Sequence, residues 1–173
     1  MNPLVLFLPV YRASITAYLA GIAILAFLDF LRIQYGLGPV PRWVGMLAIW
    51  FFVFSLHANR RRHAGRGIGI AFLPLGLAIV AKGIGAFFAM IPGAYSAMTE
   101  FAAENGVDTD DQQALAEALN DPGFQQEFQR AMQNDPELLQ QLMSATGPGS
   151  FIGFWLVIAV FAIWFARMAR PGA

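Results

Sequence analysis

The sequence predicts an all-α, polytopic membrane protein with four transmembrane helices and a short-helix insert between the third and fourth. Hydrophobic residues make up 57% of the 173 residues and charged residues only 13%, whereas a soluble domain carries roughly a quarter charged residues. The apolar residues also gather in blocks about as long as a bilayer is thick. A soluble domain of this length has too little interior to bury them, so lipid is the expected solvent.

Charged residues are separated along the chain, although the formal net charge is zero. Residues 96–149 contain ten acids and one base, Arg130, whereas the remainder contains ten bases and one acid, Asp29. A membrane between two such regions is the usual reason for the separation. The chain has no cysteine, which excludes disulfides, thiolate metal ligands and cysteine nucleophiles.

The first apolar block, residues 13–33, is long enough to cross a bilayer as a helix of about 31 Å. Residues 2–12 precede it and contain Pro3 and Pro9, so we expect an interfacial lead-in there. A signal peptide is the competing interpretation. It is disfavoured because the segment has no basic start and no small-residue cleavage site follows it.

Three further apolar blocks follow, at residues 43–57, 67–95 and 150–166. The turn before the second block, residues 34–42, is rich in Gly and Pro. The expected organisation is three membrane helices with the lead-in over 1–95, an acidic extracytoplasmic insert over 96–149, and the fourth helix with its tail over 150–173.

A basic hinge follows the second block and contains Arg60, Arg61, Arg62 and Arg66. The positive-inside rule places this hinge in the cytoplasm. With four spans, both termini are then cytoplasmic and the acidic insert lies outside. We expect the hinge arginines to set this topology or to bind anionic lipid head groups.

Helix-start signals divide the insert into three expected short helices, at residues 110–119, 122–133 and 136–144. These signals are a capping box from Thr109 to Gln112 and two Asp-Pro pairs, at 121–122 and 135–136. None of the helices is long enough to be stable alone, so we expect them to pack on each other, on the membrane surface or on a partner. Their apolar residues recur at helical spacing, which predicts a partner-binding surface made of Phe124, Phe128, Leu138, Leu139 and Leu142.

Two charged residues, Asp29 and Lys82, lie well inside apolar blocks, where a charge costs about 3 kcal/mol. In the predicted topology both lie at the same depth, roughly 22–24 Å from the cytoplasmic end. Their equal depth predicts an intramembrane charge pair. A structural salt bridge, independent snorkelling to the interface and a proton or ion relay all remain open for it.

Small residues recur at regular spacing in the third block. Gly69, Gly76 and Gly83 repeat every seven residues, and residues 81, 85 and 89 (Ala, Gly, Ala) form a small-xxx-small row. Such rows indicate close helix packing within the chain, contact between copies in a homo-oligomer, or a gating break near Pro74.

The two histidines, His57 and His63, are six residues apart with no carboxylate between them. This spacing does not favour a metal or haem site, and we predict neither a metal nor another cofactor.

The hinge Arg60-Arg61-Arg62-His63-Ala64-Gly65-Arg66, followed by an apolar span with Pro74 and Gly76, resembles the YhaH-like small bacterial inner-membrane proteins. That family typically has Arg-Arg-Leu-His-Asp-x-Gly-Arg at the start of its third helix. Here Ala64 replaces the Asp, one residue is missing before Gly65, and the long insert is an addition. The resemblance covers about 25 residues well and implies a four-helix membrane fold with no known activity.

Within the insert, residues 121–143 resemble the Asp-Pro helical repeats of a class of co-chaperone domains, which build grooves for apolar segments. The resemblance rests on the two Asp-Pro starts and on the Gln and Met residues that follow them.

Together these features predict a non-catalytic accessory or scaffold subunit that binds a protein partner outside the membrane. The alternative is a small transporter or channel component that uses Asp29 and Lys82. An enzyme is not expected because no nucleophile–base pair is visible, and no nucleic-acid partner is expected. A homo-oligomer is compatible with the sequence.

Overall fold

The computed structural model describes residues 8–35 and 41–168, and this part of the chain is helical and contains no strand. The helices are α2 (Ile15–Tyr35), α3 (Arg42–His63), α4 (Phe72–Glu104), α5 (Gln112–Asn120), α6 (Pro122–Asn134) and α7 (Pro136–Ala166), with a 3-10 turn, η1 (Gly69–Ala71), before α4. The chain divides into two compact units. The first unit comprises residues 1–83 and 151–173, and the second comprises residues 84–150.

Three helical stretches are long and apolar enough to cross a membrane, namely Ile15–Tyr35, Gly69–Glu104 and Thr146–Ala166. The all-helical fold and its membrane character are therefore confirmed, but the predicted number of such helices, four, is wrong by this measure. The second apolar block forms α3, which is 22 residues long but begins at Arg42 and ends on a polar turn. The apolar stretch between these polar ends is too short for α3 to be counted as a membrane-spanning helix.

Most polar residues in the second half of α3 face the protein interior. Ser55, His57 and Asn59 are fully buried, and Arg60 and Arg61 are nearly so. The outward face is apolar instead, with exposed Trp43, Val44, Leu47 and Phe51. Mean hydropathy counts buried and lipid-facing residues equally. It therefore underestimates how well a helix can cross a membrane when its polar side chains are buried against other helices.

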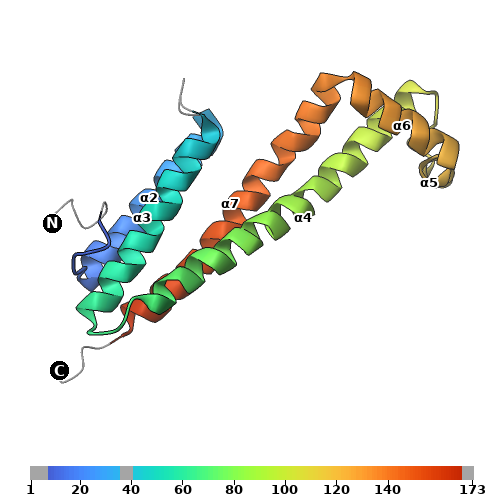
Figure 1. The fold of residues 1–173 in the computed structure, drawn as a ribbon. Coiled ribbons are helices and arrows are strands. Elements are labelled where there is room, and N and C mark those ends of the chain that lie inside the picture. The colour runs from blue at the N-terminus through green and yellow to red at the C-terminus, as the bar shows by residue number, and fades with distance from the viewer. Residues whose placement is uncertain (1–7, 36–40, 169–173) are drawn as a thin grey trace. The chain divides into compact units, whose positions relative to one another are not determined.

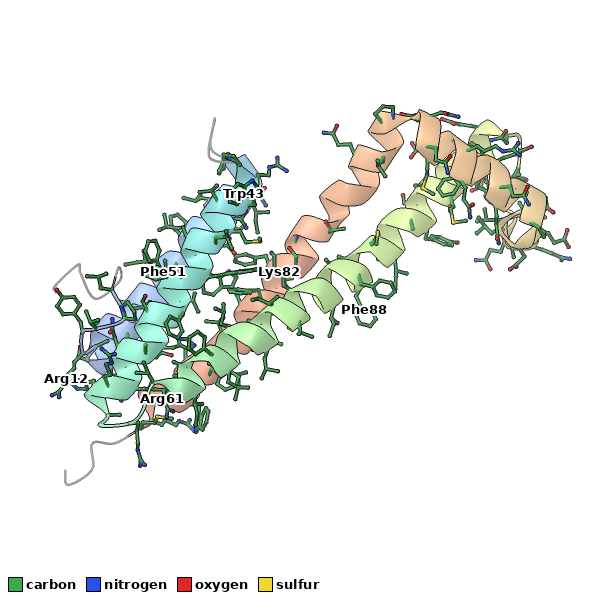
Figure 2. All side chains as sticks on the ribbon, in the orientation of Figure 1. Arg12, Trp43, Phe51, Arg61, Lys82 and Phe88 are labelled. Atoms are coloured by element: carbon green, nitrogen blue, oxygen red, sulfur yellow. The ribbon has the colours of Figure 1, made fainter. Side chains whose placement is uncertain are left out.

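The α2 and α3 helices form an antiparallel hairpin in the first unit (Figure 1). The backbone N–H of Ala13 donates to the Asn59 carbonyl at 3.1 Å, so α3 ends beside the start of α2. The Asn59 amide also donates to the Leu8 carbonyl at 2.9 Å. Figure 2 shows Arg12 and Arg61 at this end of the hairpin and Trp43 at the other end.

Four helices contribute to the core of the first unit. Its buried apolar side chains come from α2 (Tyr18, Ile22, Leu25), α3 (Ile49, Val53, Leu56), α4 (Ala78) and α7 (Phe154, Trp155, Ile158, Ala162, Phe165). Outward-facing side chains are mainly apolar as well, as at Phe27, Phe51 and Leu156. An apolar interior with an apolar exterior is what a helix bundle dissolved in lipid requires.

Small residues bring α4 and α7 into close contact. In the first unit, a Cβ atom added at Gly153 would collide with the Ala81 carbonyl oxygen. In the second unit, one added at Gly149 would collide with the Gly85 carbonyl oxygen and the Ala89 Cβ. The small-xxx-small row therefore packs within the chain, whereas Cβ atoms built at Gly69, Gly76 and Gly83 meet open space.

The helix starts of the second unit follow the Asp residues. The side chain of Asp121 accepts from the Phe124 N–H at 3.0 Å and caps α6, which begins at Pro122 as predicted. The predicted capping box at Thr109 is wrong, because α5 begins at Gln112 and Asp111 caps it. The Asp111 carboxylate accepts from two backbone N–H groups, at 2.9 and 3.4 Å.

Two helices are longer than the sequence indicates. Helix α4 continues past Pro92 to Glu104, and α7 runs from Pro136 through Pro148 to Ala166, so the third insert helix and the last span are continuous. A proline removes one backbone donor, but each helix continues through its proline. Residues 2–7 of the predicted lead-in lie outside the described residues.

Candidate functional site

Asp29 lies in the interior of the first unit with 3% of its surface exposed. Its Oδ1 atom accepts from Arg32 Nε at 2.8 Å and lies 2.8 Å from Arg32 Nη2. Its Oδ2 atom accepts from Trp155 Nε1 at 2.9 Å. Both oxygens of the carboxylate are thus bonded, one within α2 and the other to α7, and this satisfies a charge that burial would otherwise make costly.

Arg32 connects this carboxylate to the neighbouring helix. Its Nη1 atom donates to the carbonyl of Arg42, at the start of α3, at 3.3 Å. The partnership with Asp29 has a sequence signal, because residues three apart lie on one face of a helix. The sequence-based prediction instead paired Asp29 with Lys82 and did not include Arg32.

Lys82, on α4, is half-buried and lies within electrostatic range of both Asp29 and Arg32. The predicted pair of Asp29 with Lys82 thus remains a prediction, with Arg32 now the direct ion partner of the carboxylate. A carboxylate that is bonded on both oxygens is suited to holding helices together. It is less suited to picking up and releasing a proton or cation during transport.

Arg60 is 2% exposed and closes the last turn of α7. Its Nε atom donates to the Phe165 carbonyl at 3.0 Å, and its Nη2 atom donates to the carbonyls of Ala166 and Met168 at 2.9 and 2.8 Å. The last carbonyls of a helix have no partner inside the helix and carry its negative dipole end. Arg60 therefore acts as a C-terminal cap.

Arg61 is also used inside the chain. Its Nε atom donates to the Gly67 carbonyl at 2.6 Å, and its guanidinium lies 5.5 Å from the centre of the Phe165 ring. Burial and the neighbouring charge of Arg66 lower the pKa of the Arg61 guanidinium below its ordinary value. Arg62 is half-buried and Arg66 is exposed, so these two differ from the pair before them.

A small buried polar group surrounds His57 on α3. The Tyr18 hydroxyl lies 3.5 Å from His57 Nδ1, and the Phe165 ring packs edge-on against the imidazole with centroids 5.2 Å apart. Within the described residues, His57 Nε2 and Ser55 Oγ are buried without a hydrogen-bond partner. In the same residues no group of three metal-ligating side chains comes together.

In the second unit, Phe124 and Phe128 are buried, with 8% and 4% of their surfaces exposed. Both pack on the ring of Phe101, from the last turn of α4, with centroid separations of 5.4 and 5.5 Å. Ala102 and Leu115 complete the cluster of buried residues to which Phe124 belongs, with Val107 and Leu119 packed against it. The sequence carried no signal for Phe101, which lies outside the expected insert helices.

The five residues predicted as one partner-binding surface are thus placed differently from one another. Phe124 and Phe128 face Phe101, whereas Leu139 is 51% exposed. The side chains of Leu138 and Leu142 lie outside the described residues.

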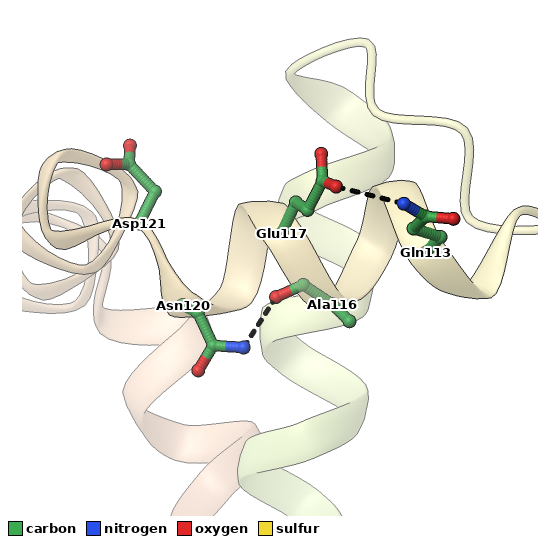
Figure 3. Close-up of a pocket in the computed structure, with 5 residues that line it drawn as sticks. All are labelled: Gln113, Ala116, Glu117, Asn120 and Asp121. Carbon is green, nitrogen blue, oxygen red and sulfur yellow. Dashed lines mark hydrogen bonds between the residues drawn. The ribbon is translucent and has the colours of Figure 1, made fainter.

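Polar and acidic side chains dominate the exposed surface between residues 100 and 135. Nine carboxylates are exposed: Glu100, Glu104, Asp108, Asp110, Asp111, Glu117, Asp121, Glu127 and Asp135. A shallow, open recess on α5 is lined by Gln113, Ala116, Glu117, Asn120 and Asp121 (Figure 3). Gln113 donates to Glu117 at 3.3 Å and Asn120 donates to the Ala116 carbonyl at 2.8 Å. These side chains of the recess are therefore already hydrogen-bonded within α5.

The chain was compared with protein-family models, with curated proteins and with solved structures. None of the three comparisons finds a match.

Proposed function

We propose that this chain is a non-catalytic integral membrane protein, an accessory or scaffold subunit that binds a protein partner through its acidic insert. One observation carries the proposal: α5 and α6 pack on Phe101 around their own small core and present an acidic outer surface. A flexible linker of this charge would remain disordered and would need no core. The acidic surface favours a partner with a basic face.

We also propose that α3 crosses the membrane as a fourth span. If α2 crosses, the hairpin returns α3 to the starting side, since Asn59 is bonded to Ala13. The apolar outward face of α3 supports the same conclusion. With the basic hinge in the cytoplasm, both termini are cytoplasmic and the insert is external, which suits the inner membrane of a bacterium.

Partner binding is tested by placing a photo-crosslinking residue at Gln126, which is exposed on α6, in the full-length protein. The same residue at Phe88, which is 64% exposed on α4 (Figure 2), gives the comparison for an apolar position. We expect a discrete protein adduct from Gln126 only. Raising the salt concentration in isolated membranes should weaken the adduct, because exposed charges are screened.

Neutralising acids that do not cap helices should abolish that adduct. The variant combines Glu104→Gln, Asp110→Asn, Glu117→Gln and Glu127→Gln. A matched variant with Gln112→Ala, Gln129→Ala and Gln133→Ala removes exposed side chains without changing charge, and should keep the adduct. An adduct that is insensitive to both salt and neutralisation would refute the charge-based proposal, and no adduct at all would refute partner binding at α6.

The fold of these variants can be checked with trypsin, because Arg130 is the single basic residue between positions 96 and 149. Cleavage after Arg130, within α6, requires local unfolding. Both variants should resist trypsin as the wild type does. Phe101→Ala, which removes the ring beneath Phe124 and Phe128, should speed cleavage and provides the positive control.

A second candidate function, a small transporter or channel component, is favoured by the three charges in the apolar interior, Asp29, Arg32 and Lys82. Purified protein in liposomes should then conduct protons or small ions, and Asp29→Asn or Lys82→Gln should reduce the flux. Flux equal to that of empty liposomes would exclude this candidate.

A further inference from the structure

Four arginines at one end of the first unit are not used by the caps described above. Arg12, Arg66 and Arg167 are exposed and Arg62 is half-buried. They belong to four different segments of the chain, namely the approach to α2, the last turn of α3, the loop before α4 and the residue after α7.

Backbone contacts bring these segments together around the end of α3. Ala13, next to Arg12, donates to the Asn59 carbonyl at 3.1 Å, and the Arg66 N–H donates to the Arg61 carbonyl at 2.9 Å. Arg60 binds the carbonyls of Ala166 and Met168, the residues on either side of Arg167. The side chains of Arg12 and Arg61 lie at the same end in Figure 2.

The first unit offers these arginines no acidic side chain as a counterion. Asp29 is the single acidic side chain in residues 1–83 and 151–173. It is buried and already bonded to Arg32 and Trp155. A cluster of exposed guanidinium groups without carboxylates attracts anions from outside the chain.

Exposed apolar side chains lie within seven residues of Arg12, Arg66 or Arg167 along the chain. They come from the start of α2, from η1 and the start of α4, and from the end of α7: Ile15, Ile70, Phe72, Leu73, Ile163 and Trp164. A soluble phosphate would leave this apolar surface uncovered, whereas the acyl chains of a phospholipid would cover it. The phosphate of the same lipid can accept paired hydrogen bonds from planar guanidinium groups.

We propose that this basic cluster, Arg12, Arg62, Arg66 and Arg167, binds the phosphodiester head group of an anionic phospholipid. Arg60 and Arg61 are assigned to the fold instead, because both are almost fully buried and each binds at least one backbone carbonyl. Of the four hinge arginines, Arg60 and Arg61 thus stabilise the fold, whereas Arg62 and Arg66 bind lipid. This assignment does not depend on the function proposed for the acidic insert.

The test uses the full-length protein in a mild uncharged detergent, with bound lipids counted by native mass spectrometry. Dioleoyl phosphatidylglycerol is titrated against dioleoyl phosphatidylcholine. We expect retention of the anionic lipid at concentrations where the zwitterionic lipid is lost. Arg66→Gln combined with Arg167→Gln should weaken that retention roughly ten- to thirty-fold, given the usual attraction of each basic residue to an anionic surface.

Arg42→Gln combined with Arg130→Gln removes two exposed arginines elsewhere and is the matched control. It should bind the anionic lipid as the wild type does, and both double variants should melt like the wild type without lipid. Equal retention of the two lipids, or an equal loss in both double variants, would overturn the proposal. Glycerol phosphate that competes as well as the whole lipid would show a soluble-phosphate site and would overturn it too.

Discussion

At the scale of single residues, the charge network around Asp29 gives the sharpest test of which cation stabilises a buried carboxylate. Asp29→Leu alone should strongly destabilise the protein, because Arg32 then remains charged and buried without its partner. The double variant Asp29→Leu with Arg32→Leu should recover most of that loss. Thermal unfolding in detergent, followed by tryptophan fluorescence, measures both effects.

The companion double variant, Asp29→Leu with Lys82→Leu, decides how much Lys82 contributes. We expect a smaller recovery than with Arg32, since Arg32 touches the carboxylate at 2.8 Å. A larger recovery with Lys82 would make the pair predicted from depth the dominant one. Trp155→Phe removes the hydrogen bond to Oδ2 and should cost about 1.5–3 kcal/mol, the usual range for a bond to a charged group.

Ser55 provides a second residue-scale prediction, because its buried hydroxyl has no partner among the described residues. Ser55→Ala should leave the melting temperature unchanged or raise it, since an unsatisfied buried polar group is removed. Ser14→Ala is the control: Ser14 Oγ accepts from the Ala17 N–H at 3.2 Å, at the start of α2. Its loss should cost about 1 kcal/mol. A marked loss of stability in Ser55→Ala would reveal a partner for the hydroxyl.

At the scale of helices, the glycines separate into packed and open positions. Gly149→Ala and Gly153→Ala should each cost about 1–3 kcal/mol, because the new methyl group meets the α4 backbone and the helices must move apart. Gly76→Ala and Gly83→Ala face open space and should be neutral, or stabilising by up to about 1 kcal/mol through helix propensity. Melting curves of the four variants in one detergent test this contrast.

An outcome in which all four substitutions behave alike would contradict the close contact of α4 with α7. A fall in oligomer size confined to Gly76→Ala or Gly83→Ala would instead assign the open glycine positions to contact between copies of the chain.

At the scale of the whole molecule, the hairpin makes topology testable at closely spaced positions. Reporters fused after His63 and after Arg170 should read cytoplasmic, and reporters fused after Tyr35 and after Gln125 should read external. The critical comparison is between the reporter after Tyr35 and the reporter after His63. If both lie on the same side of the membrane, α3 does not cross and the fourth span is lost. A cytoplasmic reading at Gln125 would overturn the charge argument itself.

The sequence alone determined the helical fold class, the apolar character of the spans and the separation of charge. Each depends on the residues of one segment: a transfer free energy into lipid, a capping carboxylate, or a loop charge. Asp121 before Pro122 is such a local signal, and the structure confirms α6 there. Local signals predicted two separate helices at residues 136–144 and 150–166, but α7 continues through Pro148 as one helix.

Only the tertiary structure decided which groups satisfy one another. Trp155 lies 126 residues from the carboxylate that it binds, and Arg60 lies 105 residues from the first α7 carbonyl that it caps. Phe124 has the same helical spacing whether its ring faces a partner or faces Phe101, so periodicity could not choose between them. Such partners are set by which helix faces pack together, and that packing depends on side chains far apart in the sequence.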